Sequence, residues 1–409
     1  MRTVDAAGLK IGDEHPPRIM GVLNVSKESP YDPSVFDDPG EAAEYVDTEL
    51  IDQGADIVDI GLESANKRFE VLSAEQELER LDTAVETLES LSGDAVFSIE
   101  TRYHEVADAA LSRGFDMVND ICGFADPEMP RICEEHDVAV GKMASPPDLE
   151  RPGAIEDVDD IYDALSLNGF TDKTIVDPAF GGWSEEKTIE DDRETFRRLR
   201  EFRGLGYPIL VSINRKNFLR QVADRSTEEA LPVSLAATSM AVERGAHVIR
   251  THDVAETRDA ALIGHEFARS RVRGHDAGDV AVEELDVTTP REAERHLNRL
   301  GVADAGDVAA DAVVRVFELR GLSDADVGAL SAAAAEAGTT VVSGATTDAD
   351  RSVLADGDGT PEAVADEGAP GRSVLLFGTP GALGNLTGAL TGGTDALSGA
   401  VETIAGAGR

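Results

Sequence analysis

The sequence predicts an eight-stranded (β/α) barrel, a TIM barrel of the α/β class, followed by a small α/β domain. Short runs rich in Val and Ile alternate eight times with longer stretches of helical apolar spacing, between Arg18 and about Arg271. The length of 409 residues exceeds one ordinary domain and accommodates a barrel plus a smaller unit. We therefore expect the barrel in residues 1–272 and the small domain in residues 279–409.

The eight predicted strands are short apolar runs, each followed by a segment with helix-like spacing. They are Arg18–Val25, Asp56–Gly61, Ala95–Glu100, Met117–Ile121, Ala139–Met143, Thr174–Asp177, Ile209–Ile213 and His247–Thr251. Capping signals agree with this order: Ser73 with Gln76 predicts a capping box that opens a helix over Ala74–Leu91. Thr227 likewise precedes two glutamates ahead of an Ala-rich helix. Eight such units are typical of a closed parallel barrel.

Beyond about Arg271 the composition changes to Ala, Gly, Asp and Thr, and Arg273–Gly278 is predicted to be a polar linker. The small domain is expected to contain strands at Val280–Val287, Ala312–Leu319, Thr340–Gly344 and Ser373–Gly378, and helices at Pro290–Leu300 and Asp324–Ala337. Asp348–Gly371 reads as a loop, and Thr379–Arg409 as one or two weak helices. The sequence assigns no chemistry to this domain.

The charge balance restricts the possible partners. The chain has 37 basic and 80 acidic residues, a formal charge of −43, which would repel nucleic acid and anionic lipid. Lysine is scarce, and this pattern is typical of a protein that works in concentrated salt, where self-repulsion is screened. Cys122 and Cys133 are too few for a disulfide framework, and Met1–Lys10 does not resemble a signal peptide. We therefore expect a cytoplasmic protein of a halophile.

Polar residues stand at the ends of all eight predicted strands, where the active site of a barrel lies. They are Asn24, Asp59 with Glu63, Glu100, Asn119, Lys142, Asp177, Lys216, and Arg250 with His252. A carboxylate and a carboxamide that face one pocket can bind a fused heterocycle with ring N–H donors beside ring acceptors, as in a pterin. Lys142, Lys216 and Arg250 would supply positive charge for an anionic group such as a diphosphate.

The runs that contain these residues resemble those of dihydropteroate synthases. In chain order they are Met20–Ser26, Asp59–Ser64, Ser98–Thr101, Asn119–Asp120, Asp177–Pro178, Asn214–Phe218 and Arg250–Val254. The resemblance extends from Arg18 to about Arg271 and is specific because seven motifs follow the family's order. It implies a transferase that joins 6-hydroxymethyl-7,8-dihydropterin diphosphate to 4-aminobenzoate and releases pyrophosphate, in folate biosynthesis. It also implies a homodimer formed through barrel helices.

The resemblance implies a role for each matched residue. Asn119 and Asp177 would hold the pyrimidine edge of the pterin, Glu100 would contact the ring, and Lys216 would lie beside the ring and its carbonyl. The roles at the other end of the substrate involve four residues: Arg250 and His252 would bind the diphosphate, Asn24 would ligate Mg²⁺, and Asp32 would assist from the first loop. Mg²⁺ suits such a site because it takes few protein oxygens and completes its shell with substrate phosphates. Catalysis would be mainly electrostatic, through stabilisation of the departing pyrophosphate.

Departures from the family pattern cluster in the two loops where the arylamine should bind. Pro30 stands in place of a phenylalanine in the first loop, and Ala65 and Asn66 replace a threonine and an arginine in the second. Lys27 and Lys67 lie in the same loops, and each is either a cation of the active site or an exposed loop residue. Three alternatives follow: a synthase that uses a different arylamine, as in methanopterin pathways, a pterin-binding methyltransferase, or a non-catalytic pterin-binding protein. A methyltransferase would not need the diphosphate cations.

Overall fold

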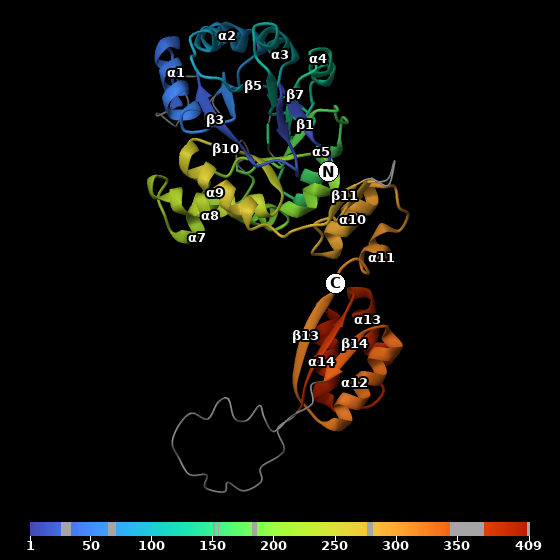
Figure 1. Cartoon of the computed structure of the whole chain (residues 1–409). Coiled ribbons are helices and arrows are strands. Elements are labelled where there is room, and N and C mark those ends of the chain that lie inside the picture. The colour runs from blue at the N-terminus through green and yellow to red at the C-terminus, as the bar shows by residue number, and fades with distance from the viewer. Residues whose placement is uncertain are drawn as a thin grey trace, which may run out of the picture. The chain divides into compact units, whose positions relative to one another are not determined.

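The computed structural model describes residues 1–25, 34–63, 71–149, 152–153, 155–181, 186–275, 281–343 and 372–406. The chain divides into two compact units, Met1–Leu285 and Asp286–Arg409. The first contains a closed barrel of eight parallel strands, so the predicted fold class is confirmed (Figure 1).

The barrel strands follow the order of the sequence, and the last pairs with the first. They are β3 (Arg18–Asn24), β4 (Ile57–Gly61), β5 (Val96–Thr101), β6 (Met117–Asp120), β7 (Ala139–Met143), β8 (Thr174–Asp177), β9 (Ile209–Val211) and β10 (Ala246–Thr251). All eight predicted strands are present. The largest difference is at β9, which ends at Val211 and not at Ile213.

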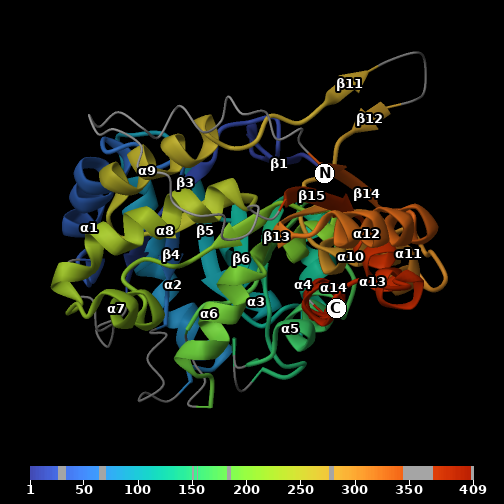
Figure 2. The same ribbon diagram turned by 90° about the horizontal axis from the view of Figure 1, so that it is seen from below.

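Helices surround the strands, as Figure 2 shows. They are α1 (Pro39–Tyr45), η2 (Val46–Ile51), α2 (Ala74–Glu89), α3 (His104–Leu111), α4 (Met129–Glu135), α5 (Val158–Ser166), α6 (Ile189–Arg197), η3 (Leu199–Leu205), α7 (Asn217–Ala223), η4 (Glu228–Ala230), α8 (Leu231–Glu243) and α9 (Val254–Glu266). The capping box predicted at α2 is present, because the Ser73 hydroxyl accepts from Gln76 N while Gln76 Oε1 accepts from Ser73 N. Buried apolar residues of the helices and of the outward faces of the strands form the main core.

A hairpin of β1 (Val4–Ala6) and β2 (Leu9–Ile11) packs at the N-terminal end of the barrel. Its Val4, Ala6 and Ile11 are buried in one cluster with residues from the beginnings of the barrel strands, among them Ile57 and Met117. The first ten residues look polar as a run, yet alternate side chains are apolar and face inward. The hairpin therefore closes the end of the barrel opposite the strand-end residues.

The second unit is a three-stranded antiparallel sheet with helices. Its elements are α10 (Pro290–Arg299), α11 (Ala305–Ala309), β13 (Arg315–Leu322), α12 (Asp324–Ala337), β14 (Thr340–Ser343), β15 (Arg372–Gly378), α13 (Pro380–Ala389) and α14 (Asp395–Gly406), with β15 between β13 and β14. Its own core includes Leu330, Leu376 and Leu386. The expected linker is wrong in part, because β11 (Arg273–His275) pairs with β12 (Ala281–Glu283) as a hairpin. Asp348–Gly371 lies outside the described residues.

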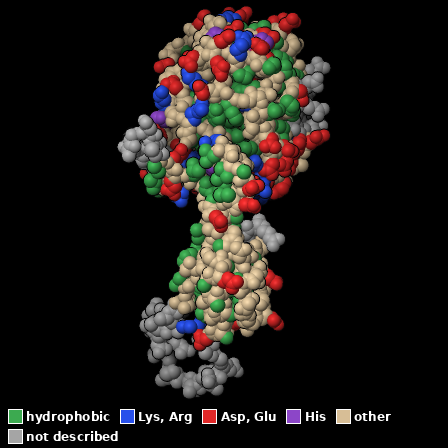
Figure 3. Space-filling model, turned by 90° about the vertical axis from the view of Figure 1, so that its right-hand side faces the viewer, with side chains coloured by type: hydrophobic (Ala, Val, Ile, Leu, Met, Phe, Trp, Pro, Cys, Tyr) green, Lys and Arg blue, Asp and Glu red, His purple; other side chains and the backbone are tan. Residues whose placement is uncertain are grey.

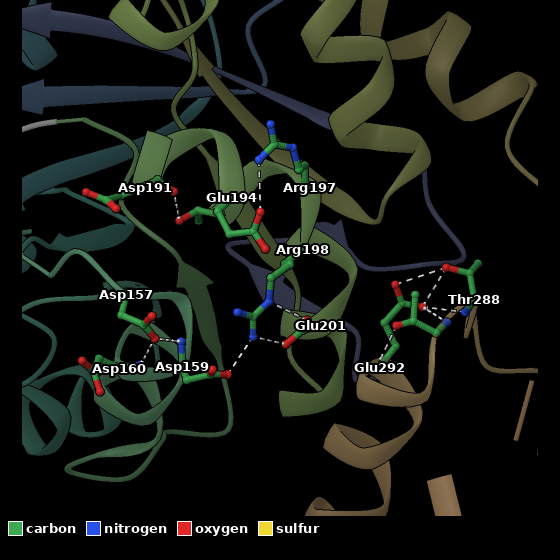
Figure 4. Close-up of polar contacts among 12 residues, drawn as sticks. Asp157, Asp159, Asp160, Asp191, Glu194, Arg197, Arg198, Glu201, Thr288 and Glu292 are labelled. Atoms are coloured by element: carbon green, nitrogen blue, oxygen red, sulfur yellow. Dashed lines mark hydrogen bonds and ion pairs between the residues drawn. The ribbon is translucent and has the colours of Figure 1, made fainter. Parts of the chain in front are cut away.

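Acidic side chains are spread over the face of the first unit seen in Figure 3, and basic side chains are interspersed among them. Arg198 is an example: it donates to Glu201 Oε1 and to Asp159 Oδ1, each at 2.7 Å (Figure 4). Asp159 is half-exposed, and a pair of this kind contributes at most about 1 kcal/mol. Within the described residues, every helix is too short or too polar to cross a membrane.

Candidate active site

A pocket of about 80 Å³ opens at the carboxyl ends of the barrel strands. It is lined by Glu100, Asn119, Ile121, Met143, Gly153, Asp177, Ala179, Phe180, Gly181, Ser212, Lys216 and Arg250. Five of the candidate residues from the sequence thus meet in one place, although they come from strands spread over the whole barrel. Register brings them together, because Glu100 lies beside Asn119 and Met143 lies beside Asp177 on paired strands.

A network of ion pairs and hydrogen bonds around Arg250 forms one side of the pocket. Asp59 Oδ2 accepts hydrogen bonds from Arg250 Nε at 2.8 Å and from Asn119 Nδ2 at 3.0 Å, and Arg250 Nη2 donates to Glu100 Oε2 at 2.7 Å. Burial lowers the pKa of Arg250, but the Glu100 and Asp59 carboxylates more than compensate and raise it above its usual range. Arg250 is therefore a permanent cation, and among the described residues its Nη1 has no hydrogen-bond partner.

Two carboxyl groups of the pocket have pKa values near neutrality. Burial raises the pKa of Glu100 to about 7 against the opposing effect of Arg250. Burial also raises the pKa of Asp177 to about 6, opposed by a hydrogen bond from Ala179 N at 2.8 Å and by the charge of Lys216. Such groups can accept hydrogen bonds from a heterocycle that carries N–H donors, or donate one when protonated.

The Asn119 carboxamide has a fixed orientation. Its Nδ2 donates to Asp59, and its Oδ1 faces Gly141 on the neighbouring strand β7. A Cβ on Gly141 would lie only 2.8 Å from Asn119 Oδ1, so glycine is needed to leave room for the carboxamide. A hydrogen-bond acceptor is thus presented at a defined place in the pocket.

Lys216 precedes α7 and contributes the second cation of the pocket. Burial lowers the pKa of Lys216, and the charge of Asp192 opposes that effect most strongly. Among the described residues, no hydrogen bond or ion pair engages its ammonium group. The group is therefore available to a ligand.

Asn24 and His252 meet through Ser34, at the ends of β3 and β10. Asn24 Nδ2 donates to Ser34 Oγ at 3.2 Å, and Ser34 Oγ lies 3.2 Å from His252 Nδ1. Burial, followed by the charge of Arg250, lowers the pKa of His252 to about 3, so the imidazole is neutral. Asp32, the remaining candidate, lies outside the described residues, as do Lys27 and Lys67.

The prediction that Lys142 contributes to the pocket is wrong. Its Nζ donates to the carbonyls of Leu165, Leu167 and Gly169, at and just beyond the C-terminal end of α5. The same ammonium lies 4.7 and 4.8 Å from the ring centroids of Phe124 and Phe170. Because side chains alternate along a strand, Gly141 faces the barrel interior while Lys142 faces the helices.

Sequence reasoning missed the residues that hold these loops in place. Arg215 donates from Nε and Nη2 to both carboxylate oxygens of Asp253, and Asn214 Nδ2 donates to the same group at 2.8 Å. This links the loop that carries Lys216 to the loop that carries His252. All three stand next to predicted site residues in the motif runs, which is the signal that would have identified them.

A second buried pair joins Glu63, which the sequence singled out, to Arg102, which it did not. Arg102, which is completely buried, donates from Nη2 to Glu63 Oε2 at 2.6 Å and to Leu72 O at 3.1 Å. Glu63 Oε1 in turn accepts from Leu72 N at 2.9 Å. These contacts bring together the two described ends of the second loop.

Among the described residues, two places offer ligand atoms of the kind that bind metal ions. His104, Glu105 and Asp126 offer ligand atoms close to one another, but Asp126 Oδ2 already accepts from the backbone N and the Nδ1 of His104, at 3.0 and 2.8 Å. At the mouth of the barrel, Asn24 offers Oδ1, which faces Gly61 while Nδ2 is engaged with Ser34. One neutral oxygen fits Mg²⁺ that takes its other ligands from phosphate and water.

Comparison with protein families gives a match to the model described as "Pterin binding enzyme" over residues 20–252. The chain is 32% identical over 242 residues to the dihydropteroate synthase of Bacillus subtilis, which covers 58% of this chain and 83% of that protein. It is 34% identical over 250 residues to a probable bifunctional folylpolyglutamate synthase/dihydropteroate synthase of Haloferax volcanii, over 58% of this chain and 29% of that longer protein.

Solved structures give the same result for the barrel. A dihydropteroate synthase from Clostridium difficile, solved in the presence of pteroic acid, aligns with a TM-score of 0.55 at 28% identity and covers 63% of this chain and 99% of its own. The enzyme from Thermus thermophilus in complex with 4-aminobenzoate aligns with a TM-score of 0.53 at 28% identity, over 65% of this chain and 100% of its own.

Proposed function

This chain belongs to the pterin binding enzyme family, and on that premise we propose that it acts as a dihydropteroate synthase. Such a transferase condenses 6-hydroxymethyl-7,8-dihydropterin diphosphate with 4-aminobenzoate and releases pyrophosphate. The observation that carries the proposal is the convergence of Glu100, Asn119, Asp177, Lys216 and Arg250 in one pocket at the carboxyl ends of the strands.

The pterin edge is assigned to the acceptors of the pocket. Asp177 takes the ring N–H and amino donors, and Asn119 Oδ1 adds a second acceptor whose position Asp59 and Gly141 fix. Glu100, beside Asn119 on the neighbouring strand β5, contacts the ring while it holds Arg250. These groups are oriented by protein contacts before a ligand arrives, which reduces the free energy needed to order them on binding.

The diphosphate is assigned to the cationic side of the site. Arg250 lines the pocket with its Nε and Nη2 held by Asp59 and Glu100, and Lys216 places an ammonium group beside the ring. His252, whose Nδ1 lies beside Ser34 Oγ, is assigned to the same end of the substrate as a neutral hydrogen-bonding group. These cations and donors stabilise the negative charge that develops on the leaving pyrophosphate, so catalysis needs no covalent nucleophile.

Mg²⁺ is proposed as the cofactor, held by Asn24 Oδ1 together with diphosphate oxygens and water. When bound, it would neutralise part of the diphosphate charge. We also assign Asp32 to assistance at this end of the substrate, from its place in the first loop.

The identity of the arylamine is the part of the proposal that depends on loops 26–33 and 64–70, which lie outside the described residues. 4-Aminobenzoate is favoured because a similar structure holds it. The presence of Lys216 and Arg250 in the pocket, with His252 at the mouth, argues for a diphosphate substrate and against a methyltransferase.

The test is turnover in molar KCl with Mg²⁺, the dihydropterin diphosphate and 4-aminobenzoate, with pyrophosphate and dihydropteroate both quantified. Lys216→Ala and Arg250→Ala should each lower kcat/KM by about 100-fold or more. Lys173→Ala, which removes a surface ammonium paired with Asp137, is the matched control and should retain full activity. Because Arg250→Ala leaves two carboxylates facing each other, its circular dichroism must match that of the wild type. Pterin diphosphate binding without product would redirect the proposal to another arylamine or to a non-catalytic role.

A homodimer is proposed through helices α6, α7 and α8. They enclose an apolar groove of about 790 Å³, and at its edge Val222 and Met240 are 70% and 45% exposed. Arg193, Arg197 and Arg244 also line it, and the first two are paired with Glu190. Light scattering in molar KCl should give the mass of two chains, and Val222→Asp should give the mass of one. A monomeric wild type would refute this assignment.

The acidic composition leads us to propose a cytoplasmic enzyme of an organism that accumulates salt. Screening of the net charge of −43 by molar KCl would make the compact state stable under those conditions.

A further inference from the structure

One wall of the pocket is the short loop that follows β8, from Asp177 to Gly181. Ala179, Phe180 and Gly181 all line the pocket. The wall is tied to the chain that follows it at two points: Asp192 Oδ1 accepts from Gly181 N at 2.9 Å, and Lys187 Nζ donates to Ala179 O at 2.5 Å. Lys187 Nζ also lies 3.5 Å from Asp192 Oδ1, and both side chains are almost completely buried.

Asp192 and Lys216 both lie close to Gly181 of this wall. A Cβ on Gly181 would be 3.6 Å from Lys216 Nζ and 3.9 Å from Asp192 Oδ2, so the two charged groups flank the position that a side chain at residue 181 would occupy. Gly181 also has a φ of +66°, a conformation that favours glycine. The absence of a side chain at residue 181 therefore allows the carboxylate to act on the ammonium at short range.

Four charged groups face Lys216 from the elements around it. Asp192 of α6 and Asp177 of β8 favour its charged form, whereas Arg250 of β10 and Lys187, just before α6, oppose it. Asp177 is itself the residue assigned to the pterin, and it has a pKa of about 6. When a ligand occupies Asp177, Asp192 is thus the other carboxylate that still faces Lys216.

We propose that Asp192 is a positioning residue of this active site, which holds the wall formed by Ala179 to Gly181 and supplies the counter-charge that keeps Lys216 an ammonium group. The proposal rests on the assigned function in one respect, because it takes Lys216 to be a ligand-binding cation. Lys187 supports the wall in two ways. Its Nζ donates to Ala179 O, and it pairs with the same Asp192 oxygen that accepts from Gly181 N.

Substitutions separate the two roles of Asp192. Asp192→Asn keeps an oxygen that accepts from Gly181 N but removes the charge, whereas Asp192→Ala removes both. Asp192→Glu keeps the charge and should preserve the titration of Lys216. Asp191→Asn is the matched control: Asp191 is adjacent and belongs to the capping box of α6 with Thr188, but it does not contact the pocket wall.

The primary measurement is the titration of Lys216 by competitive acetylation with acetic anhydride across a pH series, read by mass spectrometry of the peptide that contains it. Loss of an opposite charge at short range should lower the apparent pKa of Lys216 by about one unit or more in Asp192→Asn. Lys187→Met removes a like charge and should shift it the other way. The alkaline limb of kcat/KM should move by the same amount as the acetylation profile.

An Asp192→Asn protein whose Lys216 titrates as in the wild type and in Asp191→Asn would overturn the proposal. Acetylation needs no turnover, so the result is independent of whether 4-aminobenzoate is the substrate. A wild type without product but with a shifted Lys216 in Asp192→Asn would refute the assigned reaction and support the role of Asp192. If Asp192→Asn does not fold, Asp192→Glu decides the question, because an altered Lys216 titration in that variant would contradict the counter-charge role.

Discussion

At the scale of single residues, the site depends on side chains that have no reacting atoms. Gly141 is present because Asn119 needs its space, and Asp59 is present because Asn119 and Arg250 both donate to the same oxygen. Asp59 is fully buried, and its Oδ1 has no hydrogen-bond partner among the described residues. A substitution at Gly141 or Asp59 would therefore displace Asn119 or Arg250, although it would not remove either side chain.

Gly141→Ala tests this dependence. The new Cβ would be 2.8 Å from Asn119 Oδ1, so the carboxamide must shift. We expect kcat/KM to fall by about 10-fold or more, because misplacement of a binding group by an ångström has effects of this size. Steady-state kinetics with the dihydropterin diphosphate would measure it. Gly384→Ala on α13, where the Cβ meets nothing within 4 Å, is the control and should leave kcat/KM unchanged.

Lys142→Met tests whether Lys142 stabilises the fold and does not bind substrate. The change removes three hydrogen bonds to carbonyls around the end of α5, and we expect the free energy of unfolding to fall by about 2–4 kcal/mol. Urea unfolding in molar KCl would measure it. The KM for the dihydropterin diphosphate should stay within about twofold of the wild type, since the ammonium does not face the pocket. A large rise in KM without a loss of stability would instead indicate that Lys142 binds the diphosphate.

At the scale of elements, the β1–β2 hairpin closes the barrel, and the segment after it is anchored by a buried charge. Asp13 accepts from Arg203 Nη2 at 2.8 and 3.1 Å, lies 3.1 Å from His247 Nε2, and accepts from Arg271 Nη2 at 3.2 Å. One carboxylate thus joins the N-terminal segment, η3, β10 and the chain after α9. These contacts hold the pKa of Asp13 well below its usual range in spite of burial.

Asp13→Ala should destabilise the first unit by about 3–5 kcal/mol, because it leaves buried cations without their partner. Urea unfolding followed by circular dichroism would measure the loss. Asp172→Ala is the comparison: Asp172 pairs with Arg2 at 2.6 Å, but its side chain is 98% exposed. That change should alter the free energy of unfolding by less than about 1 kcal/mol. Equal effects of the two substitutions would contradict the anchoring role.

At the scale of the whole molecule, several buried carboxyl groups titrate above their usual range. Burial is the main cause in each case, and the groups are Glu77 and Glu100 with a pKa of about 7, and Asp120 and Asp177 with a pKa of about 6. The folded state binds protons more tightly at these sites than the unfolded state. Stability should therefore rise as the pH falls from about 8 to about 5.

Below about pH 4 the sign reverses, because Asp13 and Asp253 have lowered pKa values and their contribution is lost on protonation. Urea unfolding at fixed KCl over this range should show a maximum of stability near about pH 5. Glu77→Gln keeps an acceptor for Thr101 Oγ1 and should flatten the rise between about pH 5 and 7. A wild type most stable at about pH 8 would contradict this account.

Salt should act on the molecule as a whole. The chain has a net charge of −43, so its acidic side chains repel one another in the folded state. Screening by KCl reduces that repulsion. We expect the Tm to increase steadily as KCl is raised from tenths of molar to molar concentrations, by differential scanning calorimetry. Sucrose at matched osmolarity is the control, since it carries no charge. A Tm that is independent of KCl would show that the acidic surface has no part in stability.

Much of this molecule is determined by short stretches of sequence. The strand from Ala139 to Met143 and the helix from Asp324 to Ala337 have the bounds that periodicity and capping predict, because both signals act between residues close in the chain. The strand-end rule likewise identified Glu100, Asn119, Asp177, Lys216 and Arg250, which share one pocket. Parallel strands present their carboxyl ends at one face, so chain order alone was sufficient.

Tertiary structure decided which side of each strand faces the pocket and which distant groups hold it. Gly141 and Lys142 are neighbours in sequence, yet one serves the barrel interior and the other caps α5, because the orientation of the pleat is set by how the barrel closes. Asp192, Lys187 and Asp13 carry no local signal. Their partners come from elements that only packing brings together, and the charge of a buried group depends on neighbours that the sequence leaves far apart.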